Sequence, residues 1–101
     1  MSFVCLMEIE LHFPEGGSLK GKRKDLVSLK EQLRRRFGAS VAETEHHDLW
    51  QRATLTAALV ARESGAVEDA AAAIERHVLA RFGDGVRCER AIRSAQEVLD
   101  P

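Results

Sequence analysis

The chain has no tyrosine, a single tryptophan and only two cysteines among its 101 residues. RNA-recognition sheets stack bases on exposed aromatic side chains, and here Phe3 and Phe13 fall on the inward face of a predicted strand. A base-stacking sheet is therefore not expected. Cys5 and Cys88 both lie in predicted strands, so we expect reduced, buried thiols rather than a disulfide or an activated nucleophile.

Long apolar runs are also missing. The longest, Phe3–Met7 and Leu55–Ala61, are far shorter than the ~20 residues that span a bilayer. The first residues show neither a basic segment nor a small-residue cleavage site, so no signal peptide is expected. These features predict a cytoplasmic protein with no membrane partner.

Motifs for catalysis, cofactors and metals are absent as well. The sequence contains no GxSxG, P-loop, GxGxxG, CxxC or HxxxH pattern. His12, His46, His47 and Asp48 are possible ligands, but adjacent histidines on an extended backbone diverge and nothing fixes a coordination geometry. We therefore predict no catalytic residue, no metal site, no cofactor and no enzymatic activity.

Charge is present in quantity and is unevenly placed. Residues 20–36 hold eight of the fifteen lysines and arginines and have a net charge of +6. The whole chain is −1, so the remaining residues sum to −7. Such an uneven distribution of charge indicates an anionic partner, and nucleic acid is the first candidate.

Two periodicities alternate along the sequence. Residues 3–13 alternate apolar and polar side chains, which is typical of a half-buried strand, whereas Leu19, Leu26, Leu29, Leu33 and Phe37 share one face of a helix. Ser18 and Gly38 suit the two caps of that helix. The expected elements, in order β-α-β-β-α-β, cover residues 3–13, 19–37, 39–45, 53–62, 64–82 and 86–94.

This order predicts a single α+β domain, residues 1–101, with the ferredoxin-like arrangement. Both helices cover one face of a four-stranded antiparallel sheet of order 4-1-3-2, and the tail 95–101 either forms a helical turn or frays. The uncovered face is predicted to be broadly apolar, so we expect a homodimer through it. Its residues are Val4, Leu6, Thr54, Thr56, Ala58 and Val60.

The first helix carries the basic residues on its outer face. Contacts to phosphates through this face predict a non-enzymatic accessory factor that binds structured RNA or a ribosomal subunit. An acidic protein partner, which would make the chain a homo-oligomeric interaction module, and a merely solvated face are the alternatives. The predicted nucleic-acid-binding residues are Lys20, Arg23, Lys24, Lys30, Arg34 and Arg35.

The segment 46–52 joins the two middle strands and holds the only tryptophan. Trp50 either caps one end of the core or, with Arg52, binds a partner, because Trp and Arg are favoured interface anchors. Lys22 falls near the apolar arc of its helix, so it must either extend its ammonium to solvent or find an acidic partner. We expect an ion pair with Asp48 or Glu43.

Two of these segments carry a family resemblance. Ser18–Arg23 reads SLKGKR, and Ala42-Glu43 is followed by HHDLWQRA at residues 46–53. Together they resemble the signatures of the YlxP-like family of small bacterial proteins, domain of unknown function 503. The resemblance covers nearly the whole chain and implies a ferredoxin-like fold and a gene that often neighbours translation and ribosome-maturation factors. It implies no activity, because the family has none established.

Overall fold

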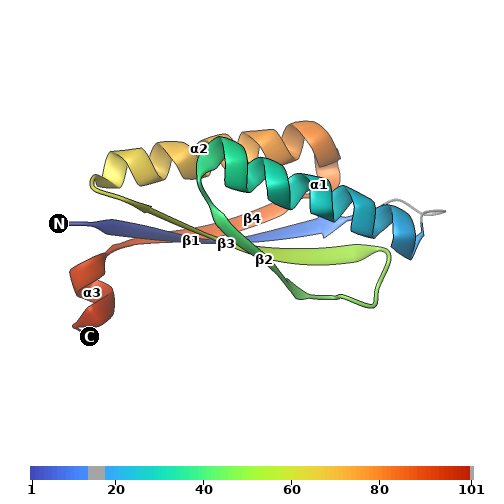
Figure 1. Ribbon diagram of the computed structural model, residues 1–101, viewed down its shortest axis with the longest axis horizontal. Helices are drawn as coiled ribbons and strands as arrows, with labels where there is room; N and C mark the ends of the chain where they lie inside the picture. Colours follow the sequence, from blue (N-terminus) through green and yellow to red (C-terminus); the bar gives the residue numbers. More distant parts are fainter. Residues whose placement is uncertain (14–17, 101) are drawn as a thin grey trace.

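A computed structural model describes residues 1–13 and 18–100. Its sheet has four antiparallel strands in the order β2-β3-β1-β4 (Figure 1), so the predicted ferredoxin-like topology is confirmed. Residues 14–17, where a proline and two glycines predict a turn, lie outside the described residues. The elements are β1 Phe3–His12, α1 Leu19–Phe37, β2 Ser40–Glu45, β3 Arg52–Ala61, α2 Ser64–Phe82, a 3-10 turn Gly83–Gly85, β4 Arg87–Ser94 and α3 Ala95–Leu99.

Helix α1 begins and ends at the residues that its sequence indicates. The Ser18 hydroxyl accepts a hydrogen bond from the amide of Gly21 at 3.0 Å, which satisfies one of the free first-turn donors. At the other end Gly38 has φ +68°, a left-handed backbone conformation that residues with a Cβ rarely adopt. The amide of Gly38 donates to the Arg34 carbonyl, and the chain then turns directly into β2.

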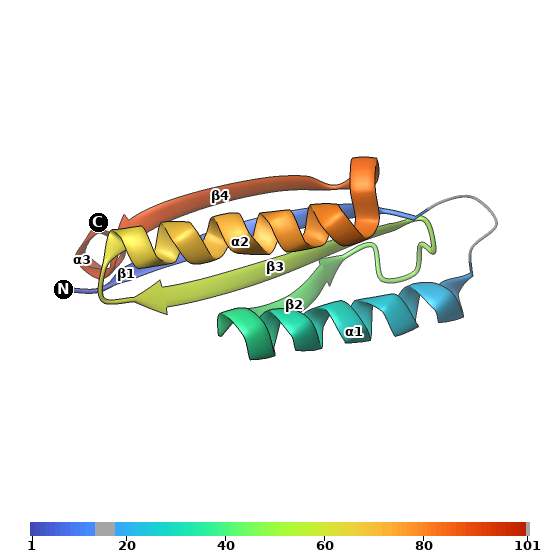
Figure 2. The ribbon, with the colours of Figure 1, turned by 90° about the horizontal axis from the view of Figure 1, so that it is seen from above.

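The core lies between one sheet face and the two long helices. Alternate residues of β1 and β3 point into it, and Figure 2 shows α1 and α2 side by side over the sheet, with α1 above β2. Leu26, Leu29 and Leu33 of α1 pack against this core, with Val67, Ile74 and Val78 of α2. Among the described residues no helix is both long and apolar enough to cross a membrane.

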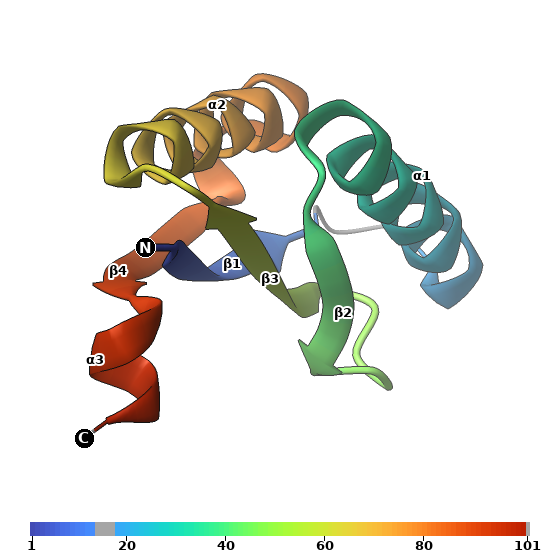
Figure 3. The same ribbon diagram turned by 60° about the vertical axis from the view of Figure 1, so that its left-hand side comes forward.

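Three details differ from, or resolve, what the sequence predicts. Thr54 was expected on the exposed part of the open face, but its side chain is buried. Arg90 interrupts the apolar pattern of β4 because it points toward α2, where its guanidinium contacts Glu68 at 2.8 Å and Glu75 at 2.9 Å. The tail forms helix α3, fixed by a reciprocal capping box between Ser94 and Glu97. Figure 3 shows α3 on the side of the sheet opposite α1 and α2.

Candidate nucleic-acid interface

The outer face of α1 presents the six predicted basic residues as one surface. All of them are exposed except Lys30, which is half-buried. Lys30 lies about 20° from Leu19 and Phe37 in helical projection, at about 100° per residue, and this places it at the border of the apolar face. From Lys20 to Arg35 the row is about 22 Å long, because an α-helix rises about 1.5 Å per residue.

Two of the six side chains also contact the protein. Arg23 donates to the His47 carbonyl at 3.4 Å, and Arg34 donates to the Val41 carbonyl at 2.8 Å. Both acceptors are neutral, so neither guanidinium charge is cancelled by its partner. None of the six forms an ion pair within the part of the chain that the structure describes. The positive charge of α1 therefore remains available to an external anion.

Lys22 points the other way, into the protein. Its side chain is 1 % exposed, and the ammonium donates to the carbonyls of His46, at 2.6 Å, and Leu49. The Lys22 Nζ also lies 3.6 Å from Glu43 Oε2, an oxygen that has no hydrogen-bond partner among the described residues. Of the two predicted partners Glu43 is therefore confirmed, and the Asp48 alternative is wrong, because the ammonium contacts the backbone of this loop and not its carboxylate.

These contacts attach the loop 46–51 to the first turns of α1. The loop turns at His46, which has φ +66°, and the imidazole Nε2 of His47 lies 3.1 Å from the Glu43 carbonyl. Leu49 is exposed and Trp50 half-buried. Arg52, the first residue of β3, is exposed. Of the predicted partner-binding residues, Trp50 thus belongs to the loop that Lys22 and Arg23 hold against the basic helix, whereas Arg52 follows the loop in β3.

The remaining candidates do not assemble into a reactive site. Across residues 1–13 and 18–100, no three His, Cys, Asp or Glu side chains lie close enough together to hold a metal ion. Both cysteines are free thiols. Burial raises the pKa of Cys5 and, together with the charge of Glu75, raises the pKa of Cys88 to about 11. At neutral pH both sulfurs are therefore protonated and weakly nucleophilic.

The sequence does not indicate the hydrogen bonds that α1 makes to the backbone of the loop 46–51. The position of Lys22 on the apolar arc signals that it needs a partner, but two of its three partners are carbonyls, which have no sequence signature. The hydrogen bond from Arg23 to His47 has none either. From the sequence, α1 and the loop 46–51 are therefore predicted as two separate regions, whereas in the structure they form one surface.

Comparison with known proteins supports the fold and a family. The sequence matches the family described as "Protein of unknown function (DUF503)" over residues 4–90. No curated protein matches.

Among solved structures, the de novo designed protein Foldit4 has a TM-score of 0.56 at 10% identity, covering 93% of this chain and 98% of that one. A cofactor-independent oxygenase, SnoaB from Streptomyces nogalater, has a TM-score of 0.53 at 15% identity, covering 98% of both chains. PelD from Pseudomonas aeruginosa has a TM-score of 0.52 at 18% identity, covering 95% of this chain and 35% of that one. At these identities the likeness concerns the fold alone.

Proposed function

This chain belongs to the DUF503 family of proteins of unknown function, and we propose that it is a non-enzymatic accessory factor that binds structured RNA, such as that of a ribosomal subunit, in the cytoplasm. The observation that carries the proposal is the outer face of α1. It holds six basic side chains, with Val27 and Glu31 between them, and none of the six forms an ion pair with an acid among the described residues.

The distribution of the other charges favours the same face. On α2 and β4, Arg90 is neutralised by Glu68 and Glu75. The open sheet face carries Glu8 and Glu89 directly opposite one another on β1 and β4, and Arg87 and Arg93 lie on either side of Glu89 along β4. This face is therefore mixed in charge, and its two adjacent carboxylates repel a phosphate backbone. RNA would contact the protein along α1, where the cations predominate.

Recognition through this helix would be directed to shape and phosphates. Lysine and arginine on one helix face can contact the backbone of a duplex without reading its bases. The loop 46–51, which Lys22 holds at the N-terminal end of the row, adds a tryptophan that can stack on an unpaired base. We therefore expect a preference for structured RNA with an unpaired loop or bulge over a plain duplex.

The test measures the affinity for a labelled RNA hairpin by fluorescence anisotropy over a series of salt concentrations. Each neutralised phosphate contributes about −0.7 to −0.9 to the slope of log K against log salt, so five exposed cations give a slope of about −4. Lys24→Glu/Arg35→Glu removes two of these contacts and should lower the magnitude of the slope by about 1.5 to 2.

The matched control is Arg62→Glu/Arg76→Glu, which makes the same change in charge at two exposed residues outside α1. If the control weakens binding as much as the α1 variant does, the interaction depends on net charge and the proposed face is wrong. The alternative is that α1 binds an acidic protein and the chain is a homo-oligomeric interaction module. This alternative replaces the proposal if the protein binds no RNA and if unlabelled tRNA does not displace an acidic protein that is bound to α1.

A further inference from the structure

The sheet face opposite the two long helices is apolar at one end only. At that end Leu6 of β1 is 54 % exposed and Val60 of β3 is 75 % exposed. Helix α3 projects from the end of β4 on this side of the sheet (Figure 3) and adds Val98, which is 55 % exposed. Between α3 and the sheet lies a groove of about 300 Å³, lined by Val4, Leu6, Ala91, Arg93 and Val98.

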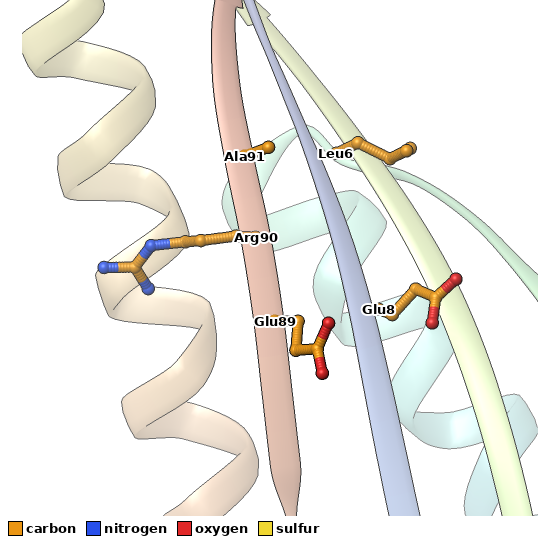
Figure 4. Close-up of a pocket in the computed structure, with 5 residues that line it drawn as sticks. All are labelled: Leu6, Glu8, Glu89, Arg90 and Ala91. Carbon is orange, nitrogen blue, oxygen red and sulfur yellow. The ribbon is translucent and has the colours of Figure 1, made fainter.

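The other end of the same face is charged. Figure 4 shows Glu8 and Glu89 on one side of the sheet and Arg90 extending to the other side, toward α2. Two register positions further along, Glu10 of β1 lies opposite Arg87 of β4. The open face therefore changes from apolar to charged along the direction of the strands, and any occupant has to match this gradient.

We propose that a second copy of this chain covers the face, related by a two-fold axis that runs parallel to the strands between β1 and β3. This rotation exchanges β1 with β3 and keeps each row of residues in its place. In the observed register Leu6 lies beside Ala58, and Val4 beside Val60. Leu6 of one copy therefore faces Ala58 of the other, so that a large side chain meets a small one and the surfaces interdigitate, as packed sheets require.

The charged end selects this axis over the alternative. With the axis parallel to the strands, Glu8 faces Thr56 of the second copy, because Thr56 is its neighbour in the register. A two-fold axis across the strands reverses the rows. If it passes through the row of Leu6, it places Arg93 on Glu89, which is favourable, but it also places Val4 on Glu8 and so buries a carboxylate against an apolar side chain. If it passes through the row of Glu8, it places carboxylate on carboxylate, which is unfavourable.

The face supplies a substantial part of the area that an interface needs. Its strands β1, β2, β3 and β4 have 10, 6, 10 and 8 residues, which gives a planar area of about 540 Å² at about 3.3 Å per residue and about 4.8 Å between strands. One partner buries about 800 Å² in a standard interface, and the exposed Val98 of α3 adds to the area of the face. The chain exposes 6477 Å², whereas a compact monomer of its mass exposes about 5,700 Å².

This dimer is independent of the proposed function. The two α1 helices lie on the outer sides of the pair, so RNA binding neither requires dimerisation nor prevents it. Failure of the RNA experiment would leave the dimer unaffected, and the absence of a dimer would leave the basic face unaffected.

The experiment is sedimentation equilibrium of the full chain at about 0.1 M and about 1 M salt, where the Debye length falls from about 10 Å to about 3 Å. We expect twice the chain mass of 11.2 kDa at both concentrations of salt. Leu6→Glu and Val60→Glu should give monomers with unchanged far-ultraviolet circular dichroism. Leu79→Glu, at an exposed apolar residue of α2, is the matched control and should remain dimeric.

A mixing experiment tests the axis. Ala58→Lys should also be monomeric, but when it is mixed with Leu6→Glu the two chains should form a heterodimer, because the new lysine and glutamate face each other across this axis. A mixture that stays monomeric overturns the axis. The proposed interface is overturned if the wild type is monomeric, or if Leu6→Glu leaves the dimer intact. It is also overturned if the dimer dissociates at high salt, because that result would indicate ionic head-to-tail contacts instead.

Discussion

The buried ammonium of Lys22 gives the sharpest stability prediction. Lys22→Met keeps most of the apolar volume of the side chain but removes the donors to His46 and Leu49 and the positive charge near Glu43. Breaking a buried ion pair by removing one partner costs about 3 to 5 kcal/mol. We expect the lower value, about 3 kcal/mol, because the Glu43 side chain retains 10 % exposure.

Converted to temperature, this loss is large for a chain of 101 residues. One kcal/mol corresponds to about 4–8 °C in a domain of this size, so the melting temperature should fall by about 12–24 °C. Lys20→Met is the matched control, because Lys20 is exposed and surface substitutions usually change stability by less than about 0.5 kcal/mol. The double variant Lys22→Met/Glu43→Gln should lose less than Lys22→Met alone, because no unpaired carboxylate remains.

The assay uses urea unfolding followed by two probes. Far-ultraviolet circular dichroism reports the whole fold, and the fluorescence of Trp50, the only tryptophan, reports the loop. In Lys22→Met we expect the emission of the folded protein to shift to longer wavelength, because the loop is no longer attached to α1. If Lys22→Met is as stable as Lys20→Met and its emission is unchanged, the interpretation of Lys22 as the residue that fixes this loop is wrong.

Two further predictions concern a backbone contact and the titration of a histidine. A Cβ at Gly85 would lie 2.9 Å from the His12 carbonyl oxygen, so Gly85→Ala should destabilise the protein by about 1–3 kcal/mol. Gly65→Ala is the control: Gly65 lies in α2 with open space around it, and the substitution should stabilise the protein by up to about 1 kcal/mol. Equal effects of the two substitutions on the free energy of urea unfolding would contradict this prediction. The pKa of His77 is lowered by burial and by the nearby charges of Arg36 and Arg81. Below a pH of about 6.5 the unfolded chain therefore binds more protons, and stability should fall as the pH decreases. His77→Gln should reduce that slope, and an NMR titration giving His77 a pKa above the ordinary value would refute the reasoning.

The arrangement of the elements could be predicted because each segment has a clear periodicity. Residues 3–13 place an apolar side chain at every second position, and the buried face of α1 repeats at helical spacing, so both elements appear in the structure almost where expected. The rules for right-handed crossovers then give the strand order without further information. Arg90 broke the pattern of β4 only because its partners, Glu68 and Glu75, are in another element.

The side-chain environment could be predicted less well. Thr54 belongs to the open face by its register, yet it is buried, and alternation along a strand cannot show what covers a residue. Whether residues 95–101 form a helical turn or fray depends on a capping box. Ser94 and Glu97 fit that pattern, but only once the end of β4 is known. The attachment of the loop to α1 rests on carbonyl groups, which every residue has and which no sequence pattern marks.

The proposed RNA-binding function is tested most directly by co-sedimentation with purified ribosomal subunits at low and moderate salt. We compare the wild type with Lys24→Glu/Arg35→Glu and with the control Arg62→Glu/Arg76→Glu. We expect the wild type and the control to pellet with one subunit and the α1 variant to remain in the supernatant. If the wild type does not pellet with either subunit even at low salt, or if the α1 variant pellets as the wild type does, binding of ribosomal RNA through the outer face of α1 is contradicted.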